Sequence, residues 1–207
     1  MCRSLGQVNQ LIENENSCFP SYYQQVSSTA RIPENNNWDQ GRSAVDSTLF
    51  PHYLEHIRFA ALTTNNRGLS NNYGPIAIIF KEPMIVHRAS VFEENPFNFC
   101  RKHEIIVGTP APSGYRANWE NRHILAMAKL HSQIEPGTDP KDFSNILLKN
   151  TPNGKTNDFI EVHIFGSFNR SAVQLIAYRK PSNKADAVLY RRLKKNLRKL
   201  SIDIEEF

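Results

Sequence analysis

The chain has 207 residues and a formal net charge of +5, with 40% hydrophobic and 22% charged residues. This length and composition predict one globular domain with a real core, and they exclude an intrinsically disordered chain. The cysteines, Cys2, Cys18 and Cys100, form no CxxC pair, so neither a disulfide framework nor a zinc ribbon is indicated. Because we see neither a leader-like apolar start nor a membrane-length apolar run, we expect a cytoplasmic protein, or one delivered into a target-cell cytoplasm.

The first part of the chain is polar and rich in asparagine. We expect residues 1–45 to form an arm or loops, with one short strand at 22–26. Residues 46–207 are expected to form a single domain of catalytic type. Its first helix is predicted over 46–57, where apolar residues recur at helical spacing and Asp46 or Ser47 can act as the cap.

Strands and helices alternate through the rest of the chain. Apolar and alternating runs predict strands at 58–64, 75–80, 84–92 and 159–165, with 173–178 as the partner of the last. Helical periodicity predicts helices at 119–134, 142–148 and 184–200. The fold class is therefore α+β, with a compact mixed or antiparallel sheet, peripheral helices and a C-terminal helix.

The C-terminal helix carries the positive charge of the chain. Residues 184–200 hold seven Lys and Arg against Asp186 alone, so the remainder is close to neutral. Within two and a half turns lie Arg191, Arg192, Lys194, Lys195, Arg198 and Lys199. Such a cluster is typical of a surface that follows nucleic-acid phosphates, so nucleic acid is an expected partner. The alternative is a solvated helix docked by its leucine seam.

Glu161 and His163 are the first candidates for chemistry. They alternate with Phe159 and Phe165 on one face of the strand at 159–165. If the strand is at an edge, this face is simply exposed to solvent. If it is central, two phenylalanines beside a carboxylate and an imidazole indicate a walled pocket.

A second candidate group surrounds the buried strand at 75–80. Tyr73 can stack on a flat ring, Arg88 can grip a phosphate with two hydrogen bonds, and Ser90 can bind a ribose or an amide. Each of these residues also has an ordinary structural explanation: a turn, a surface ion pair and a small side chain that fills space.

The order of these motifs resembles that of bacterial ADP-ribosyltransferase-fold toxins, from polymorphic-toxin, toxin–antitoxin and phage-defence systems. The resemblance covers roughly residues 55–178. It rests on Tyr-Gly-Pro before a buried strand, Arg-Ala-Ser at 88–90, a helix bearing Arg122, and Phe-Ile-Glu-Val-His-Ile-Phe-Gly at 159–166.

The resemblance implies an ADP-ribosyltransferase-type core and an enzyme that uses NAD as a substrate to modify a macromolecule. Glu161 would be the catalytic carboxylate, with His163 beside it. The dinucleotide would be bound by Thr63, Asn65, Tyr73, Arg88, Ser90 and Arg122. A toxin of this kind also implies an antitoxin or immunity protein as a partner.

Two features of the family are not matched. The early His or Arg with its Thr or Gly partner cannot be identified, although Arg58 or a residue near 22–29 could fill that role. In addition, no second acid lies two residues after Glu161. The missing acid disfavours arginine as the acceptor and leaves nucleic acid or another acceptor open. The basic C-terminal helix then favours RNA or DNA over protein.

Other chemistries find less support. The histidines show no HExxH spacing, so no metal site is expected, and no GxSxG elbow supports a serine nucleophile. Two rival functions remain: a non-catalytic nucleic-acid-binding module, and a small metal-dependent nuclease that uses Glu161 and a histidine.

Overall fold

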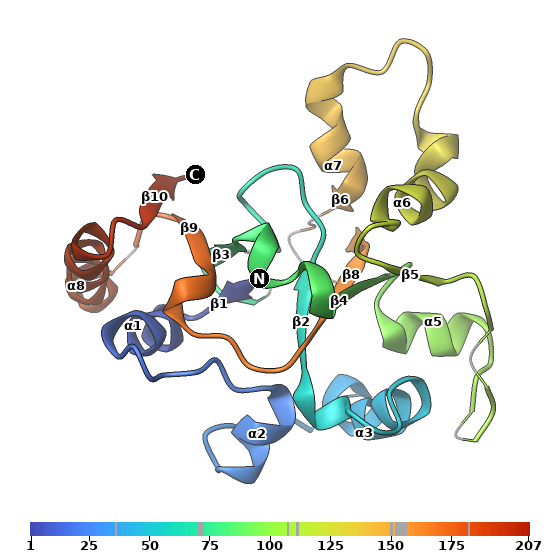
Figure 1. Cartoon of the computed structure of the whole chain (residues 1–207), viewed down its shortest axis with the longest axis horizontal. Helices are drawn as coiled ribbons and strands as arrows, with labels where there is room; N and C mark the ends of the chain where they lie inside the picture. Colours follow the sequence, from blue (N-terminus) through green and yellow to red (C-terminus); the bar gives the residue numbers. More distant parts are fainter. Residues whose placement is uncertain are drawn as a thin grey trace.

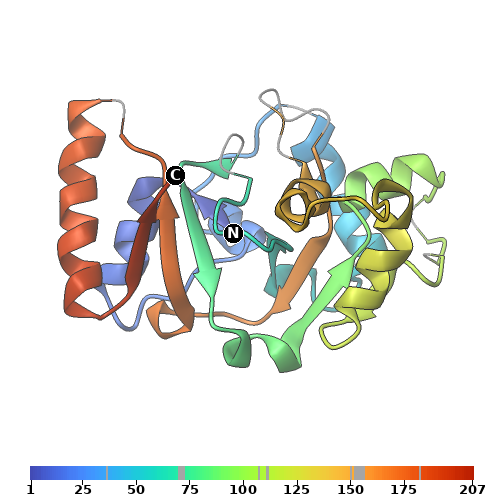
Figure 2. The same ribbon diagram turned by 90° about the horizontal axis from the view of Figure 1, so that it is seen from above.

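The computed structural model of the chain describes residues 1–207 with the exception of 36, 70–72, 107, 111, 150, 152–156 and 182. For residues 37 and 38 it describes the backbone but not the side chains. The described residues form a mixed α/β fold with mostly antiparallel strand pairs, as predicted. Two four-stranded sheets lie side by side along the long axis, with helices at both ends (Figures 1 and 2).

The first sheet has the strand order β1-β3-β9-β10, with antiparallel pairs except for the parallel pair β9–β10. Its strands are β1 (Cys2–Arg3), β3 (Ile76–Phe80), β9 (Val173–Tyr178) and β10 (Asp203–Glu206). The second sheet is antiparallel throughout, in the order β2-β8-β4-β5. Its strands are β2 (Ile57–Ala61), β8 (Glu161–Phe165), β4 (Ala89–Phe92) and β5 (Arg116–Asn118). A two-stranded ladder joins β6 (Leu148–Lys149) to β7 (Asp158–Phe159).

Polar side chains cap the first turn of several helices. The α-helices are α1 (Leu5–Glu13), α2 (Tyr22–Ser27), α3 (Asn37–Leu49), α5 (Pro96–Lys102), α6 (Arg122–Leu130), α7 (Phe143–Leu147) and α8 (Lys184–Lys199). Short 3-10 turns are η1 (Leu54–His56), η2 (Glu82–Met84), η3 (Val86–Arg88), η4 (His131–Gln133), η5 (Pro140–Asp142) and η6 (Arg170–Ala172). Capping boxes, in which a serine and a glutamine satisfy each other's backbone amides, start α1 and α2, and the Asn183 side chain caps α8.

Helices cover the outer surfaces of both sheets. The helices α1 and α8 pack together on one face of the first sheet, where Val8, Ile176, Leu193 and Leu197 are fully buried. The second sheet packs against α6 through Trp119 and Leu125, whereas its other face meets α3 and α5 in a cluster rich in phenylalanine. The core is therefore divided between the two sheets.

Several predicted elements are confirmed with small shifts at their ends. The strands at 75–80 and 173–178 and the helices at 142–148 and 184–200 all appear. The helix at 119–134 is shorter, because the 3-10 turn η4 follows Leu130. The strand at 84–92 begins only at Ala89, after the turns η2 and η3.

Other expectations were wrong. The segment at 22–26 is helical, because Ser21 and Gln24 form a capping box there. The helix predicted over 46–57 instead runs from Asn37 to Leu49 and ends before Pro51. Strand β9 pairs with β3 and β10, so it is not the partner of the strand at 161–165. Much of the polar arm expected at 1–45 is regular structure, and α1 contributes to the core.

Candidate active site

Glu161 opens the strand β8, which lies between β2 and β4 in the second sheet. Its backbone is paired with Ala61 on one side and with Phe92 on the other. Glu161 is only 5% exposed, and α3 covers the face of the sheet to which its side chain points. The edge-strand alternative is therefore wrong, and a carboxylate is held inside the protein at the end of a central strand.

His163 fixes one oxygen of this carboxylate. Its Nε2 lies 2.9 Å from Oε1 of Glu161, and because a carboxylate can only accept, Nε2 carries the proton. The rings of Phe50, Phe59 and Phe92 surround the imidazole, with centroids 4.6, 5.4 and 5.7 Å away. Within the described residues, its buried Nδ1 has no hydrogen-bond partner. His163 thus lies behind Glu161 and orients it.

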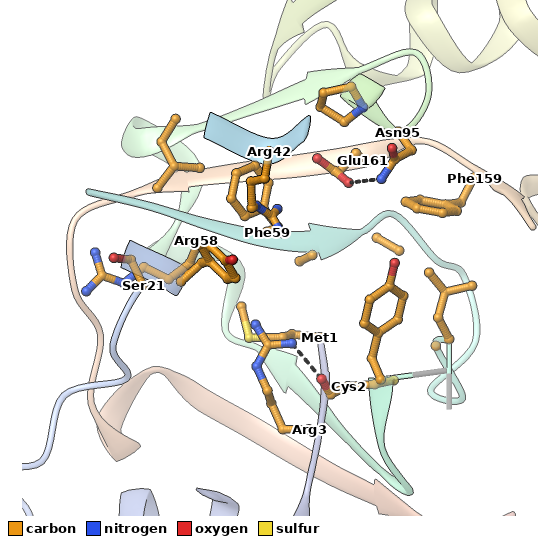
Figure 3. A pocket seen from close by; sticks show the side chains of 18 of the residues that line it. Met1, Cys2, Arg3, Ser21, Arg42, Arg58, Phe59, Asn95, Phe159 and Glu161 are labelled. Carbon is orange, nitrogen blue, oxygen red and sulfur yellow. Dashed lines mark hydrogen bonds between the residues drawn. The ribbon is translucent and has the colours of Figure 1, made fainter. Parts of the chain in front are cut away.

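The other side of Glu161 faces a cavity of about 570 Å³ between the two sheets. Asn95, which also caps α5, donates a 3.4 Å hydrogen bond to Oε2 of Glu161 at this cavity. Figure 3 shows Glu161 and Phe159 on one side of the cavity and Arg3 of β1 on the other. The volume is typical of a small-molecule site.

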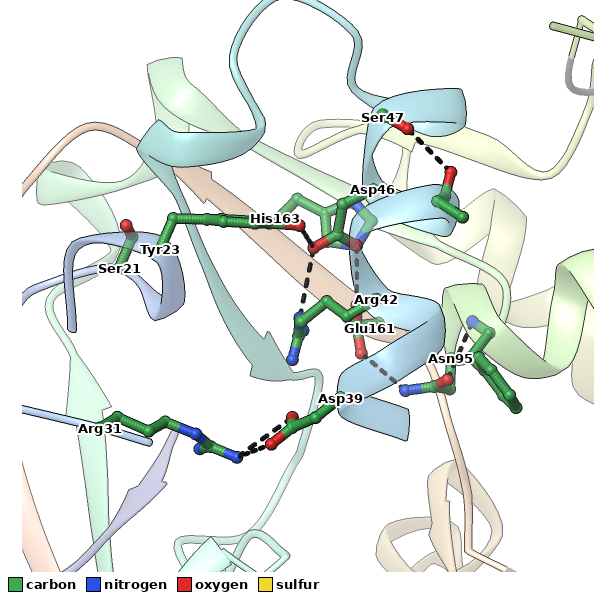
Figure 4. A network of polar contacts seen from close by, with 12 residues as sticks. Ser21, Tyr23, Arg31, Asp39, Arg42, Asp46, Ser47, Asn95, Glu161 and His163 are labelled. Carbon is green, nitrogen blue, oxygen red and sulfur yellow. Dashed lines mark hydrogen bonds and ion pairs between the residues drawn. The ribbon is translucent and has the colours of Figure 1, made fainter. Parts of the chain in front are cut away.

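A charged network from α3 forms the next part of the wall. Arg42 Nε lies 3.2 Å from Oδ2 of Asp46, and the Tyr23 hydroxyl donates a 3.0 Å hydrogen bond to the same oxygen (Figure 4). Burial raises the pKa of Asp46, with help from the charge of Glu161, although Arg42 and Tyr23 act in the opposite direction. Burial lowers the pKa of Arg42, but Asp46 and Glu161 outweigh it, so the net shift is upward.

Arg3 brings a further cation into the cavity from β1. Its Nη1 donates a 2.7 Å hydrogen bond to the Cys2 carbonyl, and its guanidinium lies 4.9 Å from the centroid of the Phe19 ring. In the described part of the chain Arg3 forms no ion pair. Burial lowers its pKa to about 10, and the charges of Arg42 and Arg31 contribute to the shift. An anion bound here would relieve this repulsion.

Arg31 and Tyr22 extend the wall outward. Arg31 Nη2 lies 3.2 and 3.0 Å from the two carboxylate oxygens of Asp39. Two guanidinium groups lie over the Tyr22 ring, those of Arg31 and Arg42, at 4.9 and 4.7 Å from its centroid. The segment expected to be an arm or loops over the domain therefore supplies one wall of the cavity.

The structure brings some of the expected dinucleotide-binding residues to this cavity. Thr63 and Tyr73 line it together with Glu161. Desolvation at the cavity wall, then the charge of Glu161, raises the pKa of the Tyr73 phenol, although 49% of the residue is exposed. Asn65 lies beside Thr63 in a turn, where the Thr63 hydroxyl donates a 2.7 Å hydrogen bond to the Asn65 carbonyl.

The remaining predicted residues lie elsewhere. Arg88 binds the carbonyls of Met84, Phe165 and Ser167 at the opposite end of β8. Ser90 is paired with His163 in the sheet and does not line the cavity. Arg122 pairs with Glu82 at 3.0 Å and stacks on Trp119, on the other face of the second sheet.

Arg58, the early arginine considered above, also reaches the cavity, but its nitrogens are engaged. Nε, Nη1 and Nη2 donate to the Phe19 carbonyl, the His56 carbonyl and Gln24 Oε1. Burial lowers its pKa. Arg58 thus braces α2 against β2, whereas Arg3 keeps donor capacity toward the cavity.

Two sequence signals could have found the missed residues. Arg42 and Asp46 are oppositely charged residues four apart, which is the spacing of a helical ion pair. Arg3 stands next to an apolar periodicity, Leu5, Val8, Leu11 and Ile12, that marks α1 as a core helix. Neither signal by itself indicates a cavity, because both depend on where the helices dock.

Neither a family model nor a curated protein matches the chain. Within the described residues, no three His, Cys, Asp or Glu side chains are grouped so that they could hold a metal ion. None of the helices in that same part of the chain has the length and apolar character needed to cross a membrane.

Proposed function

We propose that the chain is an NAD-dependent ADP-ribosyltransferase that modifies a macromolecule, with its two sheets forming an ADP-ribosyltransferase-type core. The observation that carries the proposal is the Glu161 carboxylate, presented by a central strand to a cavity of ligand size. The resemblance described above supports the same assignment.

The chemistry needs one fixed negative charge. When the glycosidic bond to nicotinamide breaks, the bond electrons leave with the ring and positive charge develops on the ribose. A carboxylate held beside that carbon stabilises the charge. The acceptor then forms a bond to the same carbon and loses a proton. Glu161 suits this role, because His163 and Asn95 hold both of its oxygens in place.

The rest of the cavity suits the two ends of NAD. Phe59, Phe159 and Tyr73 offer aromatic surfaces for a nicotinamide ring near Glu161. Arg3 is the guanidinium best placed to bind the diphosphate, since within the described residues it has no carboxylate partner. Arg88 and Arg122, engaged elsewhere, are not part of this assignment.

The wider biology belongs to the same proposal. We favour RNA or DNA over protein as the acceptor, because the basic C-terminal helix offers a surface for phosphates. A toxin that acts in the cytoplasm, or after delivery into one, and that is restrained by an antitoxin or immunity protein, fits this activity.

Labelled NAD tests the proposal directly. The protein is incubated with NAD carrying label in the adenylate part, together with RNA, DNA or cell extract, and both nicotinamide release and label incorporation are measured. We expect Glu161→Gln to lower both by about 100- to 1000-fold. This variant keeps an oxygen that can accept from His163, so its fold should be retained.

Glu120→Gln makes the same chemical change at an exposed position and should leave the rates unchanged. If the wild type releases no nicotinamide, or Glu161→Gln is as active as Glu120→Gln, the proposal fails. Shifted nucleic acid without label would favour a binding module, and magnesium-dependent fragmentation would favour a nuclease.

A further inference from the structure

The helix α8 has two opposite faces. Tyr190, Leu193 and Leu197 are buried and dock the helix against α1 and the first sheet. The residues at 184, 191, 195 and 198 follow one another along a single side of the helix, away from this seam. All four are exposed cations, and we name them the α8 cation stripe: Lys184, Arg191, Lys195 and Arg198.

The structure separates this stripe from cations that already have partners. Arg192 donates a 2.8 Å hydrogen bond to Glu13 of α1. Lys194 lies over the rings of Tyr178 and Tyr190, at 5.7 and 5.5 Å from their centroids. In contrast, no residue of the α8 cation stripe forms an ion pair with any described residue. Two of the six cations predicted to bind nucleic acid are therefore engaged in holding α8.

The stripe faces solvent at one end of the molecule. Figures 1 and 2 place α8 at one extreme of the long axis, with α5 and α6 toward the other. The stripe spans on the order of 20 Å, the length of about six base pairs. The helix dipole stabilises a cation near the C-terminus, which explains Arg198. The same dipole destabilises a cation in the first turn, so it does not explain Lys184.

We infer that the α8 cation stripe is a nucleic-acid docking surface that binds the phosphate backbone without reading sequence. A membrane surface is a poorer match, because the outward side of α8 carries no aromatic residue and Val188 is its main exposed apolar side chain. The inference extends the proposed function by giving the acceptor a place to dock, and the binding itself needs no NAD.

Equilibrium binding without NAD tests this surface. Fluorescence anisotropy is measured with labelled RNA, single-stranded DNA and duplex DNA of 20 nucleotides or base pairs, over a series of salt concentrations. Four phosphate contacts predict a slope of log affinity against log salt of about −3.6 for duplex and about −2.8 for single strands. The triple variant Arg191→Glu, Lys195→Glu, Arg198→Glu should lose about 100-fold in affinity at moderate salt.

A charge-matched control separates the stripe from net charge. Lys81→Glu, Lys141→Glu and Lys149→Glu make the same overall change at exposed positions outside α8, and binding should remain close to wild type. The milder triple Arg191→Gln, Lys195→Gln, Arg198→Gln keeps helix-forming side chains and should also bind weakly, which guards against a folding defect in the Glu triple.

Three outcomes would overturn the inference: no nucleic-acid binding by the wild type, equal losses in the stripe and control triples, or tighter binding to phosphatidylserine vesicles than to every nucleic acid. Glu161→Gln should bind nucleic acid as the wild type does. A protein that binds nucleic acid through the stripe but releases no nicotinamide would therefore refute the enzyme and leave this surface standing.

Discussion

The Glu161–His163 pair lies in a buried cluster of phenylalanines. Ordinarily such a cluster only contributes packing, but here Phe50, Phe59 and Phe92 enclose an imidazole whose single paired nitrogen points at a carboxylate. The rings leave the imidazole little freedom, so the oxygen that it holds is fixed as well. Orientation of a charged group by rigid neighbours is what preorganised electrostatic catalysis requires.

If His163 positions Glu161, its replacement should affect the rate more than substrate binding. We expect His163→Leu to lower kcat for NAD cleavage by about 10- to 100-fold, which corresponds to one charge-assisted hydrogen bond, with KM nearly unchanged. His163→Gln, whose amide nitrogen can reach the same carboxylate oxygen, should restore most of kcat. Steady-state kinetics with urea unfolding of each variant checks this. Equal kcat in both variants, or a change confined to KM, would contradict a positioning role.

Asp39 should make stability depend on pH. Burial raises the pKa of Asp39, but hydrogen bonds from the Glu34 amide and Arg31 outweigh it, so the pKa lies below its ordinary 3.8. A carboxyl with a depressed pKa stabilises the fold above its unfolded-state pKa, and this stability is lost as pH falls through the folded-state value. We expect Asp39→Asn to lower the free energy of unfolding by about 1 kcal/mol at pH 7, because Arg31 is partly exposed.

Urea unfolding at pH 7, 4 and 3 measures the difference between Asp39→Asn and the wild type. The difference should shrink steadily below pH 4. Asp142→Asn, an exposed aspartate on a 3-10 turn, should show no difference at any of these pH values. A loss for Asp39→Asn that persists unchanged at pH 3 would mean that packing, and not the charge, stabilises this wall.

Among the elements, strands and helices with a strong pattern could be predicted from the sequence, and those defined by docking could not. The apolar run of β3 and the leucine seam of α8 were sufficient to predict these two elements, because the spacing of the apolar residues defines the face that each element buries. Helix α3 was misplaced, because its polar first turns look like a loop until Asp39, Arg42 and Asp46 meet their partners. The pairing of β9 could not be predicted either, because the local sequence pattern of a strand does not determine its neighbours in the sheet.

Strand β1 depends on one glycine. Gly74 has a φ of +111°, and a Cβ built there would overlap the backbone carbonyl group of Arg3. Gly74→Ala should therefore push β1 away from β3 and lower the free energy of unfolding by about 2 to 4 kcal/mol. Gly6→Ala, in α1 with open space around it, should instead stabilise by about 0.5 to 1 kcal/mol. Urea unfolding compares the two, and similar values for both would show that β1 is not tightly docked.

At the scale of the whole molecule, the candidate site is a product of assembly. The carboxylate and two lining residues, Thr63 and Tyr73, could be predicted from the sequence. Arg3 and Arg42 could not, because Arg3 comes from the first sheet and Arg42 from a helix that covers the second. A cavity between sheets collects side chains from segments that are distant in sequence, so local motifs find only those on its strands or a few residues from their ends.

This arrangement predicts that a ligand of the cavity stabilises both sheets together. ADP-ribose retains the diphosphate and lacks the scissile bond, and at 100 times its Kd it should stabilise the fold by about 2.7 kcal/mol. For a chain of this size the melting temperature should rise by about 5 to 10 °C. Arg3→Met keeps a side chain that can pack on Phe19 but removes the charge, and it should abolish most of the shift. Lys141→Met, at an exposed position outside the cavity, should retain it. A full shift in Arg3→Met would place the diphosphate elsewhere, and the bridge between the sheets would then have to come from other cavity residues.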